Sequence, residues 1–387
     1  MTEESRKLAS VQKVTAIKPI EGKDRIVLAQ VEGWEVIVSK DFKVGDLCVY
    51  FEIDSILPNI PLFEALKKRS NLRIKTMKMG GVISQGFVIS LQEAEQVAKA
   101  VKEKLPKKLK EGIDLTKILH VEKYEEDMMN NRQNAPKHGK LYKFFMRFGW
   151  FRKLVKGSSF DTSWPWFIAK TDETRWNNII GKLKSYQEQG LIFQKTVKMD
   201  GQSATFLLDK LLKKGSWSFS VCSRSLRINP KDTMNEAFWN TAKKYKIQEL
   251  LEYFRDTIVP DLHIGSDVQY ICLQGEQCGP KIQKNRIGLL QNKLYVFNLI
   301  VKTEDGVFKL NPEQFKETFY RFSQLETVPY LGETKLEKIT PDWFAEQSFG
   351  YYDESKGLLR EGVVFRNYEH DISFKAVSEK YLLKHGI

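Results

Sequence analysis

Residues 191–209 read LIFQKTVKMDGQSATFLLD, and this stretch decides the fold of the longer, C-terminal part of the chain. Apolar residues dominate both of its ends, and its middle holds the polar run KMDGQ. We expect two strands joined at a tight turn, in which Gly201 lets the backbone pass close to a ligand. Lys198 would then stand beside the turn, a setting that suits a lysine that reacts covalently.

A second lysine motif, AKTDETRW around Lys170, competes for the same role. It is typical of a helix start, with Thr171 or Asp172 as the N-cap and Glu173 in the first turn. Capping explains these residues without catalysis, so we favour Lys198 as the reactive lysine.

The sequence around these motifs predicts an α+β fold. From about Ser158 to the C-terminus, strand and helix patterns mix without regular βαβ alternation, which favours antiparallel sheets. From Val11 to Ser90, short alternating stretches such as RIVLAQVEGWEVIVSK are broken by turns at Gly33 and at Gly45-Asp46. Five or so strands in about 80 residues fit an OB-like β-barrel.

The segment between these two regions has a different character. It contains the charged, helical-period run LQEAEQVAKAVKEKLPKKLKEG and the basic aromatic run KLYKFFMRFGWFRKLVKG, and we interpret it as a connector. The basic run either packs as an amphipathic helix, which we favour, or contacts nucleic acid directly. We therefore divide the chain into an OB-like domain (1–92), a charged and basic helical connector (93–157) and a C-terminal domain (158–387).

The charge balance favours a polyanionic partner. The chain has 62 Lys and Arg against 49 Asp and Glu, a formal charge of +13, so nucleic acid is the first partner to consider. The four cysteines form no CxxC pair, which argues against a zinc site and a disulfide framework. No apolar run reaches the length of a membrane span, and we expect an intracellular protein, either cytoplasmic or nuclear.

A lysine that attacks phosphorus needs a lowered pKa, supplied by cations, a metal or desolvation. The KxDG motif at Lys198 is by itself a weak, four-residue signal, and a solvated lysine in a turn is the simpler reading of it. Its neighbours in the sequence make the assignment specific.

The motifs from Phe167 onward stand in one order: FIAKTDETRW, KMDG, VCSRSLRI, YICLQGEQCGPKIQKNRIGL, LYVFNLIV, EGVVFR and SFKAVSEKYLLKH. In this order they resemble the nucleotidyltransferase domain of ATP-dependent RNA ligases, in the group that seals nicks and carries an N-terminal OB domain. IEGKDRI, VEGW and VGDLCVYFEIDSILP resemble that OB domain. The resemblance implies an antiparallel-sheet, ATP-grasp-like ligase domain and covers nearly the whole chain.

The resemblance also assigns roles to single residues. It makes Lys198 the adenylated lysine and Asp200 its metal-associated neighbour. It sets Arg224 against the nucleotide phosphates, whose geometry a guanidinium fork matches. It assigns Glu276 to the ribose region, and both Glu276 and Glu361 to the shell of the catalytic metal. Taken alone, these glutamates would be structural members of ion pairs.

Three further residues follow from the same resemblance. Lys375 would orient the triphosphate, and Arg175 would reach the leaving pyrophosphate. Tyr295 and Phe297 share one face of a strand, and we choose Phe297 to stack on adenine while the other ring packs in the core.

Two positions depart from the family pattern. Val197 stands where relatives often have glutamate, so the adenine contact there must come from the backbone. Val377 stands where relatives have a second lysine, so Lys375 would need support from Lys380 or Lys356.

The resemblance implies a monomeric enzyme that uses ATP and Mg²⁺ or Mn²⁺ to join 3′-hydroxyl and 5′-phosphate ends of RNA or of an RNA-containing duplex. The AMP group would pass from Lys198 to the 5′-phosphate before the ends join. The alternatives are a GTP-dependent capping guanylyltransferase and a non-catalytic OB-type nucleic-acid-binding protein. In capping enzymes the OB domain normally follows the transferase domain, and here the expected order is the reverse.

Overall fold

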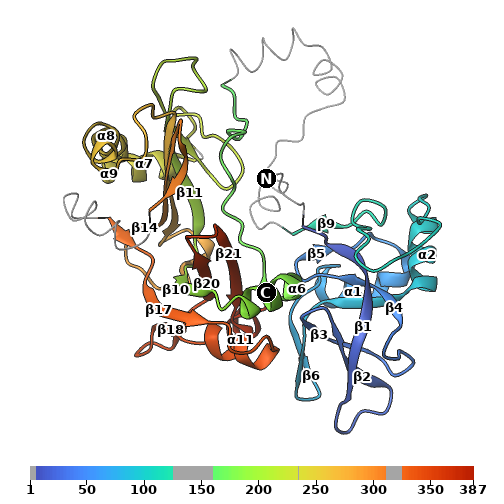
Figure 1. Cartoon of the computed structure of the whole chain (residues 1–387). Coiled ribbons are helices and arrows are strands. Elements are labelled where there is room, and N and C mark those ends of the chain that lie inside the picture. Colours follow the sequence, from blue (N-terminus) through green and yellow to red (C-terminus); the bar gives the residue numbers. More distant parts are fainter. Residues whose placement is uncertain (1–5, 125–159, 234, 311–324) are drawn as a thin grey trace.

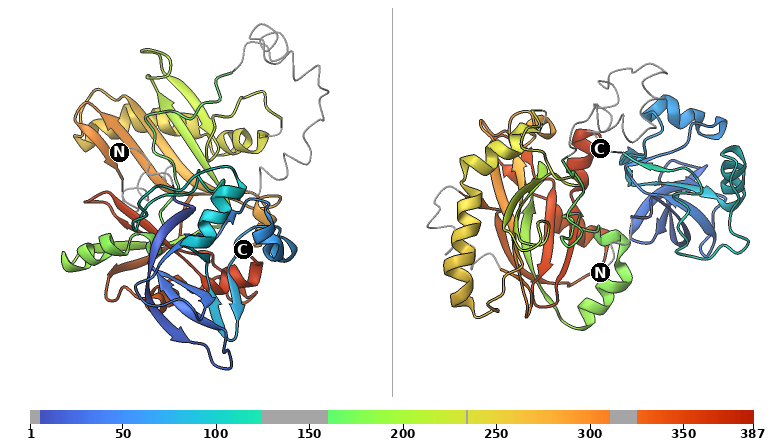
Figure 2. Two further views of the ribbon diagram at one scale, coloured as in Figure 1. Left: turned by 90° about the vertical axis from the view of Figure 1, so that its right-hand side faces the viewer. Right: turned by 90° about the horizontal axis from the view of Figure 1, so that it is seen from above.

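The computed structural model describes residues 6–124, 160–233, 235–310 and 325–387. Figure 1 shows an N-terminal domain beside a larger C-terminal domain, and the view from above in Figure 2 shows the same arrangement. The basic aromatic run of the expected connector lies outside the described residues. No helix among the described residues is long and apolar enough to cross a membrane.

The N-terminal domain is a curled antiparallel sheet with the strand order β3-β2-β1-β4-β8. Its strands are β1 (Ala9–Pro19), β2 (Ile26–Val31), β3 (Trp34–Ser39), β4 (Leu47–Phe51) and β8 (Phe87–Ser90). A register shift between Val14 and Ala16 bends β1, so that one long strand pairs with β4 along its first half and with β2 along its second. The Gln85 N–H donates to the Glu35 carbonyl at 2.8 Å and draws the edge strand β3 toward β8.

Helix α2 (Leu91–Ala100) covers this sheet and begins with a capping box. The Ser90 hydroxyl accepts from the Glu93 N–H at 3.1 Å, and the Glu93 carboxylate accepts from the Ser90 N–H at 2.7 Å. Residues 105–121 also pack against the N-terminal core. The division at residues 92 and 157 stays a prediction, although residues 93–121 contribute to the first core. The smaller elements are β5 (Ser55–Ile56), η1 (Pro61–Phe63), α1 (Glu64–Ser70), β6 (Met77–Met79), β7 (Val82–Ser84) and β9 (Glu122–Lys123).

The C-terminal domain consists of two antiparallel sheets with helices on their outer faces. The smaller sheet has the order β17-β10-β20-β21, and its strands are β10 (Ile192–Lys198), β17 (Tyr330–Lys335), β20 (Gly362–Asn367) and β21 (Ile372–Val377). The larger sheet has the order β12-β11-β13-β14-β15, all antiparallel, and the two-residue strand β16 pairs with β14 in parallel. Its strands are β11 (Gln202–Asp209), β12 (Ser218–Cys222), β13 (Tyr270–Cys278), β14 (Lys293–Thr303), β15 (Gly306–Lys309) and β16 (Glu326–Thr327).

The helices bury one apolar face of each sheet. Helices α7 (Glu236–Lys244), α8 (Ile247–Tyr253) and α9 (Val259–Leu262), with the π-turn η3 (Phe254–Ile258), pack on the larger sheet. Helices α6 (Ile180–Glu188) and α11 (Pro341–Ser348), with η2 (Trp176–Asn178), pack on the smaller one. The remaining elements are η4 (Gln283–Asn285), β18 (Tyr351–Asp353), β19 (Leu358–Leu359) and α12 (Glu379–His385). The α+β class and the antiparallel sheets predicted from the sequence are thereby confirmed.

The AKTDETRW motif does not begin a helix, and this expectation was wrong. The segment up to Arg175 is extended, η2 begins at Trp176 and α6 only at Ile180. Asp172 bonds the guanidinium of Arg224 through both carboxylate oxygens, so it caps no helix. The motif serves a long-range contact that local capping patterns cannot reveal.

Element η2 joins the two domains through hydrogen bonds on both sides of Gly33. The Asn177 side-chain amide donates to the Gly33 carbonyl at 2.7 Å, and the Gly33 N–H donates to the Asn177 carbonyl at 3.1 Å. The Trp34 indole N–H donates to the Asn178 side chain at 2.7 Å, and the Asn178 amide donates to Glu52 at 2.6 Å. The domains are therefore held at a defined orientation by paired polar groups.

We expect Gly33→Ala to open this junction. A Cβ at Gly33 would lie 2.7 Å from the Asn177 Cα and 2.9 Å from its carbonyl oxygen, whereas a Cβ at Gly181 in α6 would meet nothing within 4 Å. In urea unfolding, Gly33→Ala should lose about 1–3 kcal/mol of stability as an overpacked site does. The matched Gly181→Ala should be neutral or gain up to about 1 kcal/mol, because alanine favours a helix. Equal stability of the two variants would contradict the close junction.

Candidate active site

Lys198 and Glu361 meet where β10 and β20 pair. The antiparallel register sets Lys198 opposite Gly362, so the preceding Glu361 reaches the lysine, and their Nζ and Oε2 atoms lie 2.6 Å apart. The Tyr352 hydroxyl donates to the Lys198 carbonyl at 2.6 Å and accepts from the Glu361 N–H at 3.1 Å. Tyr352 thus fixes the backbone of both partners.

The pKa of Lys198 is raised, whereas a lowered pKa was expected from the sequence. Burial lowers its pKa, but the negative charges of Glu361 and Glu276 outweigh burial and raise the pKa above its ordinary value. In the protein alone Lys198 is therefore an ammonium ion, and its activation requires a change in the surrounding charge.

Glu276 faces the same space from the larger sheet, where β13 pairs with β11. Burial raises the pKa of Glu276 to about 8. Lys198 opposes this rise, and the carboxylates of Glu361 and Asp200 add to it. Three carboxylates thus surround one lysine between the two sheets.

Asp200 is held by two residues that the sequence reasoning did not single out. The Arg286 guanidinium lies 3.1 Å from its carboxylate, and the Tyr381 hydroxyl donates a short hydrogen bond to it. Both residues lie inside motifs that carry the resemblance, but neither has a spacing or charge pattern that indicates a partner 86 or 181 positions away. Only the folded chain brings them together.

Lys375, and not Lys198, has the lowered pKa that was expected of the nucleophile. Burial and the nearby positive charges of Lys198 and Arg175 lower its pKa to about 7. The backbone N–H of Lys375 donates to the Thr174 carbonyl at 2.8 Å, and this bond ties β21 to the segment before η2. Lys375 can therefore exist as a neutral amine or a cation near neutral pH.

The expected support for Lys375 from Lys380 or Lys356 was wrong. The Lys380 ammonium lies over the Phe349 ring, 4.1 Å from its centroid, and Lys356 pairs with Asp353 at 2.9 Å. Arg175 is instead the cation beside Lys375: a backbone bridge joins the two residues, and the positive charge of Arg175 contributes to the lowered pKa of Lys375.

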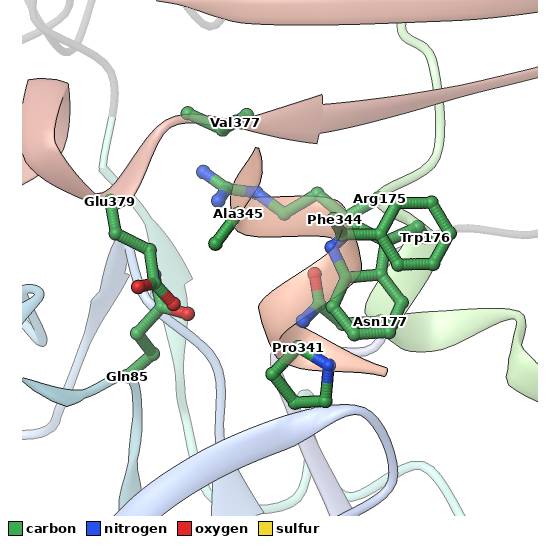
Figure 3. Close-up of a pocket in the computed structure, with 9 residues that line it drawn as sticks. All are labelled: Gln85, Arg175, Trp176, Asn177, Pro341, Phe344, Ala345, Val377 and Glu379. Carbon is green, nitrogen blue, oxygen red and sulfur yellow. The ribbon is translucent and has the colours of Figure 1, made fainter. Parts of the chain in front are cut away.

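Arg175 lies at the domain junction. Figure 3 shows its side chain in a small pocket, extending toward Val377. Gln85 of the N-terminal domain and Glu379 of α12 line the same pocket. Burial and the charge of Arg6 lower the pKa of Arg175, and the carboxylate of Asp54 opposes them. Arg175 thus lies between the N-terminal domain and Lys375.

The remaining predicted site residues lie around this cluster. Arg224 reaches it through Asp172, whose carboxyl pKa is lowered because Arg224 and Lys375 outweigh its burial. Lys170 is exposed, whereas Lys198 is half-buried.

A Cβ at Gly201 would lie 2.4 Å from the Gln277 carbonyl oxygen, so the close approach at the turn is to strand β13. A nucleotide contact at Gly201 stays a prediction.

Val197 and Phe297 belong to one apolar cluster between the sheets. Tyr295 is buried in it and Phe297 is half-buried, which leaves part of the Phe297 ring accessible. The Arg366 guanidinium lies 5.4 Å from the Phe297 ring centroid. A stacking contact between adenine and Phe297 stays a prediction.

No group of three or more His, Cys, Asp or Glu side chains within the described ranges is arranged to hold a metal directly. Burial and the nearby charge of Glu361 nevertheless raise the pKa values of both Asp200 and Glu276, so the three carboxylates lie close together. Such a set suits a divalent ion that keeps its own waters, as Mg²⁺ does, because the carboxylates can accept hydrogen bonds from those waters. Their role in metal binding stays a prediction.

Comparisons with known proteins agree with this geometry. Residues 8–91 match a family described as an OB-fold domain, and residues 192–381 match the family described as RNA ligase. The chain is similar to the RNA ligase of Naegleria gruberi solved with pyrophosphate, at 26% identity and a TM-score of 0.74, over 98% of this chain and 99% of that one. A variant of the same ligase solved with ATP and manganese matches at 26% identity and 0.73, over the same shares. A variant solved with AMP and manganese gives the same values.

The protonation of Glu276 predicts a pH-dependent stability. Its pKa is about 8 in the folded protein against an ordinary value of 4.5, so between these pH values the folded state holds a proton that the unfolded state has lost. That stability is present at pH 5 and is lost as the pH rises toward 8. Glu276→Gln lacks this proton, so without nucleotide or divalent ions its Tm relative to wild type should rise from pH 5 to pH 8. A constant difference in Tm would contradict the raised pKa.

Proposed function

Because the chain is an RNA ligase with an N-terminal OB-fold domain and a C-terminal ligase domain, we propose that it joins RNA 3′-hydroxyl and 5′-phosphate ends with ATP, through an AMP adduct on Lys198. We propose further that it acts as a monomer on nicks in RNA-containing duplexes. The observation that carries the proposal is the half-buried group of Lys198, Glu361 and Glu276 between the sheets, with Lys375 beside it.

The first step makes the adduct. Lys198 Nζ attacks the α-phosphorus of ATP, a P–N bond forms, and the bond to the pyrophosphate oxygen breaks. The lysine must first lose a proton, and Glu361 at 2.6 Å is in position to accept it. A divalent cation beside Asp200, Glu276 and Glu361 would offset the negative charge around Lys198, lower the pKa of the lysine and make this transfer easier.

The phosphates need positive charge as pyrophosphate departs. Lys375 and Arg175 supply it in this proposal, since Lys375 lies close enough to both Lys198 and Arg175 for their charges to lower its pKa. A triphosphate would raise the lowered pKa of Lys375 and hold the lysine in its charged form. Arg224, kept in place by Asp172, would contact the nucleotide phosphates, and Val197 and Phe297 would pack against adenine.

Mg²⁺ or Mn²⁺ is the expected metal, and Asp200, Glu276 and Glu361 would hold its hydrate. A bound divalent ion would reduce the charge on the α-phosphate. The arginine and tyrosine on Asp200 keep that carboxylate oriented toward the cluster.

Two further transfers complete the reaction. The 5′-phosphate of the RNA displaces Lys198 from the AMP phosphorus, and the 3′-hydroxyl then attacks the activated 5′-phosphate and releases AMP. These steps depend mainly on alignment and on stabilised negative charge.

A capping guanylyltransferase would use GTP with the same lysine chemistry. The OB-fold domain precedes the ligase domain in this chain, and similar solved ligases are described with ATP or AMP. Both observations favour the RNA ligase over the capping enzyme.

The choice of lysine and of nucleotide is tested in one experiment. Incubation with labelled ATP and Mg²⁺ should give a covalent label on wild type and on Lys170→Met but none on Lys198→Met, because only Lys198 stands in the carboxylate cluster. Labelled GTP should give no adduct. Denaturing electrophoresis measures the label, and an adduct that depended on Lys170 would overturn the assignment.

The sugar at the nick provides a second test. A protein distinguishes RNA from DNA through the 2′-hydroxyl and the sugar geometry, and a misaligned 3′ end loses about a hundredfold in rate. A pre-adenylated nick with ribonucleotides on its 3′-hydroxyl side should therefore be sealed much faster than an all-DNA nick in single-turnover assays. Equal rates would remove the RNA preference and leave the ligase chemistry intact.

A further inference from the structure

Basic side chains from three distant segments gather at the end of the C-terminal helix. They come from the N-terminal domain, from the loop after β13 and from α12, and we call them the junction patch: Lys75, Lys284, Lys384 and His385. Figures 1 and 2 show the C-terminus lying between the two domains. The patch therefore exists only when the domains are joined.

Direct contacts fix the end of α12 on the N-terminal domain. The Lys75 ammonium donates to the Gly386 carbonyl at 2.8 Å, and the Thr76 N–H donates to the Ile387 carbonyl at 3.2 Å. Leu382 of α12 is buried in the N-terminal core. Burial, together with the positive charges of Arg73 and Lys284, lowers the pKa of Lys75, so these cations are close enough to repel one another.

The loop that carries Lys284 is held in an unfavourable backbone conformation. Lys281, Gln283, Lys284 and Asn285 all have positive φ angles, between 45° and 67°, a region that such residues rarely adopt. The Asn285 side chain holds the loop through the Leu289 carbonyl at 2.8 Å. Strain of this kind persists where the surrounding structure imposes it, and it is often found at functional sites.

The patch is continuous with the candidate active site. The His385 ring lies 4.4 Å from the Tyr381 ring, centroid to centroid, and the Tyr381 hydroxyl bonds Asp200. Arg286, two residues after Lys284, bonds the same carboxylate. A phosphate on the patch would thus lie one or two side chains from the residues that surround Lys198.

Three carboxylates near the patch pair with cations outside it. Asp54 pairs with Arg73 at 2.6 Å, Asp200 with Arg286 at 3.1 Å, and Asp353 with Lys356 at 2.9 Å. Lys284 and Lys384 are exposed to solvent. The three lysines supply the positive charge of the patch, because burial and the neighbouring cations lower the pKa of His385. Cations brought together against their mutual repulsion attract polyanions, and a nucleic-acid backbone presents successive negatively charged phosphates.

We propose that the junction patch binds backbone phosphates of the RNA strand whose end lies at Lys198. The inference rests on the proposed ligase function, because it names the contact that seats the RNA in that site. Both domains contribute to the patch, so the N-terminal domain takes part in RNA binding at the active site itself. Phosphate contacts position the strand and carry no base sequence.

The test uses the full chain with Lys75→Gln and Lys284→Asn combined. Glutamine retains a donor for the Gly386 carbonyl, and asparagine tolerates the left-handed backbone at position 284. The affinity for pre-adenylated, nicked RNA duplex is measured at several salt concentrations. Loss of two phosphate contacts should reduce the slope of log affinity against log salt by about 1.5. Sealing at low RNA concentration should fall in proportion to the affinity.

The matched control, Lys99→Gln with Lys104→Gln, removes the same charge at and just after α2, on the outer side of the N-terminal domain. Its salt slope should equal that of wild type. Retained AMP-adduct formation by the patch variant shows that it is folded, and Lys284→Arg should preserve binding.

Three outcomes would overturn the inference. These are an unchanged salt slope in the patch variant, an equal loss in the control, or a raised KM for ATP with normal RNA affinity, which would assign the patch to the triphosphate. Failure of wild type to form any AMP adduct would instead refute the proposed function.

Discussion

The ion pair between Lys198 and Glu361 is the contact around which the C-terminal domain is built. Moving charges from water into protein costs several kcal/mol for each ion unless partners and hydrogen bonds compensate. The smaller sheet therefore has to pair β10 with β20 in one register, and the Tyr352 hydroxyl holds both backbones there. The same cluster keeps Lys198 protonated in the protein alone, so the lysine must lose a proton before it can act as a nucleophile.

The sequence predicted those strands and turns that depend on residues close together in the chain. The hairpin around Gly33 and the turn at Gly201 follow from alternation and a break, and the strands lie there. Motif order pointed to Lys198, Glu276 and Glu361, which the fold does bring together. Their predicted roles came from resemblance, since no local pattern shows that residues 163 positions apart will meet.

What the sequence did not predict depends on long-range partners. AKTDETRW looked like a helix start because capping patterns are local, whereas Asp172 is engaged by Arg224, 52 positions away. The lowered pKa was expected at Lys198 and is found at Lys375, because three carboxylates face the first lysine and cations face the second. Charge at a buried site is the sum over several chain segments, and one segment alone does not determine it.

The central claim is that Lys198, among these carboxylates, receives AMP from ATP. The most direct measurement is tandem mass spectrometry of the wild-type protein after incubation with ATP and Mg²⁺, under neutral conditions that preserve the acid-labile P–N bond. The account predicts one AMP group, on the peptide that contains Lys198. AMP on any other lysine, or an unmodified protein that still seals RNA, would contradict it.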